Sequence, residues 1–94
     1  MPAYWIAHAE ITDPESYGKY AALAGPAIAA AGGRFLARGG RHRQLEGKDR
    51  ARNVLIEFPS LEAAEACYNS PAYQEALAFA KDSSIRDIVI VEGA

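Results

Sequence analysis

Four polar side chains have the types that bind or transform small molecules, and strand alternation places them on one face of a predicted sheet. His8, Arg38, Asn53 and Glu57 combine an imidazole, a guanidinium, an amide and a carboxylate, with Tyr4 beside them. Enclosed in a small cavity, such groups make a pocket for a polar molecule. The alternative, which we favour, is an ion-pair cluster that fixes the register of a dimer, because buried charges persist only when paired. In both cases we expect Arg38 and Glu57 to be buried and hydrogen-bonded on the face away from the helices.

Aromatic side chains form a second group of candidates. Tyr17 and Tyr20 come from one predicted helix, Tyr68 and Tyr73 from another, and Trp5 lies beneath them on a strand. Between a sheet and its helices, these rings either line an apolar cleft with hydroxyl groups at its mouth or form a plain core. Core packing is the expected role of Trp5 and Tyr20. The other three tyrosines are candidates for both roles.

Metal binding and nucleophilic catalysis have little support in the sequence. His8 and His42 are the only histidines, and no pair of residues has the spacing of a zinc site. Cys67 falls on the buried stripe of a predicted helix, where a cysteine is usually an unreactive packing residue. We therefore expect no metal site, no cysteine nucleophile and no tightly bound cofactor.

Size and charge restrict the class of protein. A chain of 94 residues is long enough for one domain, residues 1–94, with a single core. The formal net charge of -2 argues against a nucleic-acid surface, and the basic residues between Arg34 and Arg52 are interrupted by Glu46 and Asp49, as in a solvated loop. No apolar run approaches the roughly 20 residues that span a bilayer. We expect a cytoplasmic protein without nucleic-acid or membrane partners.

The elements that must position these residues can be predicted from periodicity and caps. Strands are expected over residues 3–11, 34–38, 53–58 and 85–92, where β-branched and aromatic residues gather. Asp13 and Pro14 start a helix that ends at Gly32. Ser60 starts a second helix, which is expected to break and restart at Ser70 and Pro71.

The resulting order is β-α-β-β-α-β, an α+β arrangement. Right-handed crossovers then give a four-stranded antiparallel sheet with the helices on one face, the ferredoxin-like fold. One set of alternating strand residues is wholly apolar and should face the helices: Trp5, Ala7, Phe35, Ala37, Val54, Ile56 and Phe58. The opposite face, with Tyr4, Ile6, Leu36 and Leu55, is too apolar to be left in water. We expect it to pack against a second copy of the chain.

The sequence also resembles a known family. Matching segments include Thr12-Asp13-Pro14-Glu15, Gly32-Gly33-Arg34-Phe35-Leu36-Ala37-Arg38-Gly39-Gly40 and Ile56-Glu57-Phe58-Pro59-Ser60, and the resemblance covers essentially the whole chain. It is similar to an uncharacterised single-domain family, a domain of unknown function, within the dimeric α/β-barrel (ferredoxin-like) superfamily. The resemblance implies a homodimer whose two sheets face each other. It implies no particular reaction.

Two functions are therefore expected from the sequence. The first is a small homodimer that binds or transforms a small organic molecule in a cleft between sheet and helices. Superfamily relatives that are cofactor-independent monooxygenases, isomerases or decarboxylating enzymes use such a cleft. The haem-degrading relatives need a histidine on the second helix, and residues 60–80 contain none. The alternative is a non-catalytic dimeric module that binds a ligand or another protein.

Overall fold

A computed structural model describes all residues, Met1–Ala94, as four strands and three helices. In chain order these are β1 (Ala3–Ile11), α1 (Pro14–Ala30), β2 (Arg34–Arg38), β3 (Arg52–Phe58), α2 (Leu61–Asn69), α3 (Pro71–Lys81) and β4 (Ser84–Glu92). All predicted elements are present. The second helix breaks at Ser70 as expected, so that α2 and α3 together form the second crossover.

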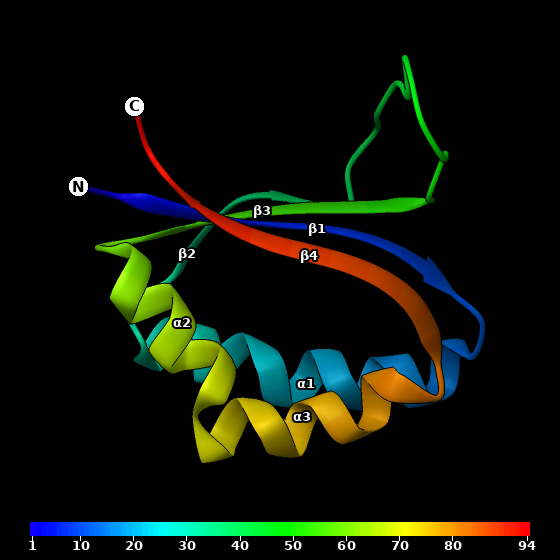
Figure 1. Cartoon of the computed structure of the whole chain (residues 1–94). Coiled ribbons are helices and arrows are strands. Elements are labelled where there is room, and N and C mark those ends of the chain that lie inside the picture. Colours follow the sequence, from blue (N-terminus) through cyan, green and yellow to red (C-terminus); the bar gives the residue numbers. More distant parts are fainter.

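The four strands form one antiparallel sheet in the order β2-β3-β1-β4. All three helices cover one face of this sheet, here called the inner face, and leave the other, the outer face, uncovered (Figure 1). This is the predicted βαββαβ arrangement. None of the helices has the length and hydrophobicity that crossing a membrane requires.

Short side chains begin each helix. Asp13 accepts a hydrogen bond from the Ser16 amide at α1, and the Ser60 hydroxyl accepts one from the Ala63 amide at α2. The Ser70 hydroxyl accepts from the Tyr73 amide and so begins α3. Each cap satisfies an amide that the first helical turn leaves free.

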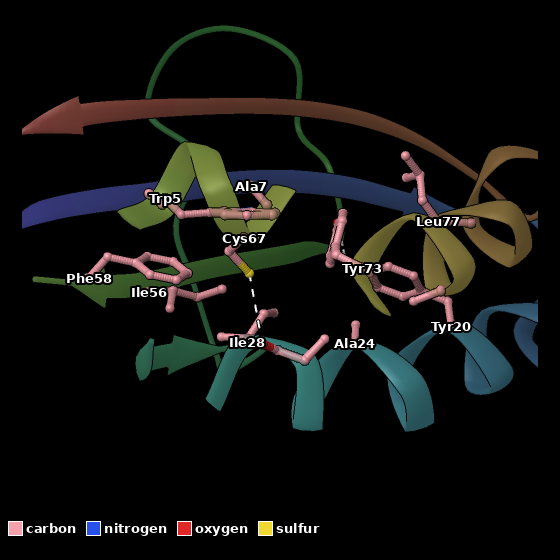
Figure 2. Packing of buried hydrophobic residues seen from close by; sticks show 14 of the residues in the cluster. Trp5, Ala7, Tyr20, Ala24, Ile28, Ile56, Phe58, Cys67, Tyr73 and Leu77 are labelled. Carbon is pink, nitrogen blue, oxygen red and sulfur yellow. Dashed lines mark hydrogen bonds between the residues drawn. The ribbon is translucent and has the colours of Figure 1, made fainter. Parts of the chain in front are cut away.

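The core lies between the inner face and the helices and is unusually aromatic. Trp5 stacks on Phe58 with ring centroids 5.9 Å apart and meets the edge of Tyr73 at 5.1 Å (Figure 2). Cys67 is buried within the same cluster, as expected, and burial raises the pKa of its thiol. Three other inner residues of β1 are small and buried, which leaves room for the large rings: Ala3, Ala7 and Ala9.

A β-bulge in β2 overturns part of the predicted alternation. The register pairs Phe35 with Ile56 but Ala37 with Leu55, so that Leu36 is the extra residue. Ala37, predicted to face the helices, therefore pairs with an outer-face residue. Arg38 pairs with Val54 and lies on the inner face, not on the outer face with Glu57. The prediction was wrong because strict alternation fails wherever a strand contains one extra residue.

Two glycines give a test of this packing. A Cβ on Gly33 would lie 2.5 Å from Ile28 Cγ2 and 2.9 Å from Phe58 Cζ, whereas a Cβ on Gly18 would meet nothing within 4 Å. We expect Gly33→Ala to lower the free energy of unfolding by about 1–3 kcal/mol through overpacking. Gly18→Ala, inside α1, should raise it by about 0.5–1 kcal/mol. Urea denaturation measures both, and equal stability of the two variants would contradict the described contact between α1 and β3.

Candidate functional site

Three arginines lie on the inner face, among the apolar residues that pack under the helices. Arg52 of β3 and Arg86 of β4 both pair with Ala9, so they flank this small residue from either side of β1. Arg38 of β2 joins them because of the bulge. Arg38 is exposed, so the prediction that it would be buried was wrong, whereas Arg52 and Arg86 are half-buried. Guanidinium groups are costly to bury without a partner, so Arg52 and Arg86 call for an explanation beyond packing.

These arginines open onto a cleft between α1 and the β2–β3 half of the sheet. The cleft has a cavity volume of about 30 Å³ and is open to solvent, and ten of its 14 lining residues are hydrophobic. We call it the arginine-lined cleft. Its principal side chains are Trp5, Tyr17, Tyr20, Arg38, Arg52 and Arg86.

Arg86 joins two helices to the last strand. Its Nη2 donates to the hydroxyl oxygens of Tyr20 at 3.1 Å and Tyr73 at 3.0 Å, and these two oxygens are 2.8 Å apart. The guanidinium also lies 4.7 Å from the centroid of the Tyr20 ring. Burial alone would lower the pKa of Arg86, but the tyrosine oxygens raise it above its ordinary value, so the group stays charged.

Burial has the opposite consequence for the two phenols. It raises the pKa of Tyr20 and of Tyr73 above the ordinary value of 10.0, and the neighbouring Arg86 offsets only part of this effect. Both hydroxyls are therefore neutral at physiological pH. In the cleft, Tyr20 can donate a hydrogen bond but is a poor general base.

The other two guanidinium groups lie near glycines, but only Arg52 lies too close for a Cβ to be added. A Cβ on Gly39, whose φ is +68°, would lie 2.5 Å from Arg52 Nη1, and a Cβ on Gly25 would lie 3.5 Å from Arg38 Nη2. Arg38 stacks on Phe35, with its Cζ 4.1 Å from the ring centroid. The left-handed backbone of Gly39 favours glycine at this position, and a side chain there would displace the Arg52 guanidinium.

Two N–H groups in the cleft have no acceptor. The Nε atoms of Arg52 and Arg86 are both buried and both lack a hydrogen-bond partner. Most buried donors in proteins are paired, and leaving one unpaired costs about 1–3 kcal/mol. A bound oxyanion would supply the missing acceptor.

The predicted site residues are divided between the two faces of the sheet. Arg38 and Tyr17 line the arginine-lined cleft, and Tyr73 lies behind it as the partner of Arg86. Tyr68 lies outside, in a separate groove beside β4. Trp5 is buried as expected, and Tyr20 is buried but also lines the cleft.

The remaining four predicted residues lie on the outer face as two separate pairs. A ring nitrogen of His8 hydrogen-bonds with Asn53 Oδ1. Glu57 accepts from Arg34 Nη2 at 3.0 Å and from the Tyr4 hydroxyl at 3.5 Å, so its partner is Arg34 and not the predicted Arg38. No group of three metal-binding side chains gathers anywhere in the chain.

Arg52 and Arg86 were not among the site residues predicted from the sequence. Both could have been found from alternation alone, because Arg52 shares parity with Val54 and Ile56, and Arg86 shares parity with Ile88 and Ile90. An arginine in the buried set of a strand is the signal. The nearly continuous apolar run of β4 concealed it.

Comparison with known protein families assigns this chain to one of them. The sequence profile described as "Domain of unknown function (DUF1330)" matches residues 2–94. The chain belongs to the DUF1330 family. A search of curated proteins found no significant match.

Solved structures with the same fold share little sequence with this DUF1330 chain. A protein of unknown function from Rhodopseudomonas palustris has a TM-score of 0.79 at 18% identity, covering 99% of this chain and 82% of that chain. SnoaB, a cofactor-independent oxygenase from Streptomyces nogalater, has a TM-score of 0.71 at 12% identity, covering 99% and 93%. A dimeric ferredoxin-like protein of unknown function from Jannaschia sp. CCS1 has a TM-score of 0.67 at 17% identity, covering 99% of this chain and 100% of that chain. These similarities confirm the ferredoxin-like fold.

The buried phenols predict a loss of stability at alkaline pH. The pKa of Tyr20 and of Tyr73 is raised in the folded state, so both keep their protons above pH 10 while the unfolded chain releases them. Their contribution to the free energy of unfolding is complete below pH 10. Above pH 10 it decreases by about 1.4 kcal/mol per pH unit for each tyrosine. Urea denaturation between pH 9 and 11 measures the slope, and a double Tyr20→Phe, Tyr73→Phe variant should flatten it. An equally steep slope in that variant would contradict the assignment.

Proposed function

We propose that this protein is a cytoplasmic homodimer that binds a small organic anion with an apolar body in the arginine-lined cleft. The observation that supports this function is the convergence of Arg38, Arg52 and Arg86 on an otherwise aromatic and aliphatic cavity. Two of these guanidinium groups have buried Nε atoms without an acceptor. Planar guanidinium groups suit carboxylates and other delocalised oxyanions, to which they can donate two parallel hydrogen bonds.

The lining residues also indicate the chemical nature of the ligand beyond its anionic group. Most of the lining is hydrophobic, as in small-molecule sites generally. The space inside the cleft is only about 30 Å³, so a ligand larger than a water molecule must displace side chains at its mouth. Tyr17 and Tyr20 line the cavity. An aromatic or branched aliphatic acid fits this combination better than a sugar or a nucleotide, which would need many more polar partners.

Conversion of the ligand is a second candidate function. Fixed positive charge and the neutral Tyr20 hydroxyl would stabilise an anion that forms on a bound molecule, which is the basis of oxyanion-type catalysis. SnoaB, which has the same fold, is a cofactor-independent oxygenase. However, no lining residue of the cleft is an acid or a histidine that could remove a proton. The geometry therefore supports binding of a preformed anion more directly than its formation.

We expect Arg52→Gln to weaken binding of such an anion by about 10- to 100-fold, because a charge-assisted hydrogen bond is lost. Isothermal calorimetry with benzoate, phenylacetate and isovalerate measures the effect, and the matching amides test the need for charge. Oxygen consumption in the same mixtures shows whether any bound acid is converted.

Lys19→Gln is the matched control, since it removes the same charge from an exposed position on α1 outside the cleft. It should leave the affinity unchanged. Equal binding of acids and amides, or equal affinities of the Arg52→Gln and Lys19→Gln variants, would contradict the proposed ligand class.

The outer face supports the homodimer. Four large hydrophobic residues of the sheet are about half exposed although the rest of the chain has a well-buried core: Leu36, Ile85, Val89 and Val91, at 45–55%. On β4, the last three alternate along the outer face opposite Glu10, Ile6 and Tyr4. A contiguous apolar surface of this kind usually marks an interface. Two copies related by a two-fold axis would cover it in one step.

Val89→Asp should dissociate the dimer without unfolding the subunit, because this side chain is 55% exposed within a single chain. Analytical ultracentrifugation measures the mass, and circular dichroism checks the fold. Leu23→Asp, at 37% exposure on α1, is the control and should remain dimeric. A monomeric wild type, or a Val89→Asp variant that stays dimeric, would contradict the face-to-face arrangement.

A further inference from the structure

The β2–β3 loop, residues 39–51, rises from the outer face of the sheet, on the side opposite the helices (Figure 1). It contains no helix or strand, and it carries Leu45, which is 90% exposed. This is the most exposed large hydrophobic residue of the chain. A leucine held away from the protein in this way adds nothing to the packing of its own subunit, so its role must be sought in a partner.

Hydrogen bonds within the loop hold its shape. His42 Nε2 and Asp49 Oδ1 are 3.1 Å apart and close the loop across its middle. Within this closure, the Gln44 side-chain amide donates to the Glu46 carbonyl, and Gly47 makes the turn with a φ of +84°. A loop that is already ordered loses little conformational freedom on binding. Leu45 is therefore presented in a defined position.

Arg50 fastens the base of the loop to the outer face. Its Nε donates to Asp87 Oδ2 at 3.0 Å, and its Nη1 lies 3.6 Å from Glu10 Oε1. These acids lie on β4 and β1, and the Arg50 side chain between them is only 16% exposed. The loop is thus anchored on the surface proposed above for the dimer.

The outer face offers an apolar surface for Leu45. Ile85, Val89 and Val91 of β4 are exposed there in a single row, whereas β2 contributes only Leu36. The polar neighbours are also complementary. Arg43 and Lys48 lie two and three residues from Leu45, with Glu46 directly beside it. Asp87, which Arg50 of the same chain contacts, lies within the β4 row with a side chain that is 70% exposed. Opposite charges at the edge of an apolar contact favour association and set its orientation.

We propose that the β2–β3 loop of each subunit clasps the other, with Leu45 packing on the outer row of the partner's β4. The occupant of this face is a second copy of the chain, so the inference rests on the homodimer proposed above. A two-fold axis parallel to the strands brings the loop, which emerges on the β2–β3 side, over the β4 side of the facing sheet. Each dimer then contains two identical clasps.

The first test is the dimer dissociation constant of Leu45→Ser. Loss of two leucine contacts, each worth roughly tenfold in affinity, should raise this constant by about 100-fold. Sedimentation velocity over a dilution series measures it. The control is Leu23→Ser on α1, which should leave the constant unchanged. Because Leu45 is so exposed, the variant should melt like the wild type under conditions where both are monomeric.

The second test locates the contact. Chains with Leu45→Cys and chains with Val89→Cys are mixed and exposed to mild oxidation, and the mixed disulfide is measured by mass spectrometry. The one natural thiol, Cys67, is buried and gives no background. We expect a crosslink between the two kinds of chain and none when Leu23→Cys replaces Leu45→Cys.

The outcomes separate the clasp from the dimer. An unchanged dissociation constant for Leu45→Ser, without the mixed disulfide, in a protein that Val89→Asp makes monomeric would overturn the clasp and leave the dimer intact. A monomeric wild type would overturn both proposals, while leaving anion binding in the arginine-lined cleft to be judged by calorimetry.

Discussion

The burial of one guanidinium group constrains the rest of this structure. Arg86 lies beneath the helices, where an unpaired charge would be costly, and Tyr20 and Tyr73 accept its hydrogen bonds. These partners come from α1 and α3, so a single group connects both long helices to the last strand. Because two phenols and a guanidinium must meet within 3.1 Å, the helices cannot slide over the sheet without breaking the contact. The same contact therefore holds in place the helix and the strand that line the arginine-lined cleft.

The fold could be predicted from the sequence because its determinants are local. Proline and short polar residues mark the helix starts, and the apolar alternation of β1 and β3 identifies the inner face. The division into inner and outer faces was also correct for Trp5, Ile56 and Phe58, which are all buried. These signals depend on neighbours within a few residues. They need no knowledge of which strand lies beside which.

The candidate site could be predicted only in part because it depends on register. One extra residue at Leu36 moves Arg38 to the inner face, and no feature of the local sequence identifies this bulge. Arg52 and Arg86 flank the same residue only because both pair with Ala9, and that pairing is determined by the whole sheet. Tyr17, a predicted candidate, lines the cleft because an aromatic residue on the buried stripe of α1 borders the space that the sheet leaves. The cleft is a product of topology more than of any motif.

The bulge at Leu36 has another consequence, which concerns the edge of the sheet. β2 is an edge strand, and a regular edge exposes a row of free amide and carbonyl groups on which a further strand can form. An extra residue breaks that row in the middle of a strand of only five residues. Growth of the sheet from this side, the first step toward fibres, is therefore disfavoured. The irregularity that gives the cleft its third positive charge also protects the protein against aggregation.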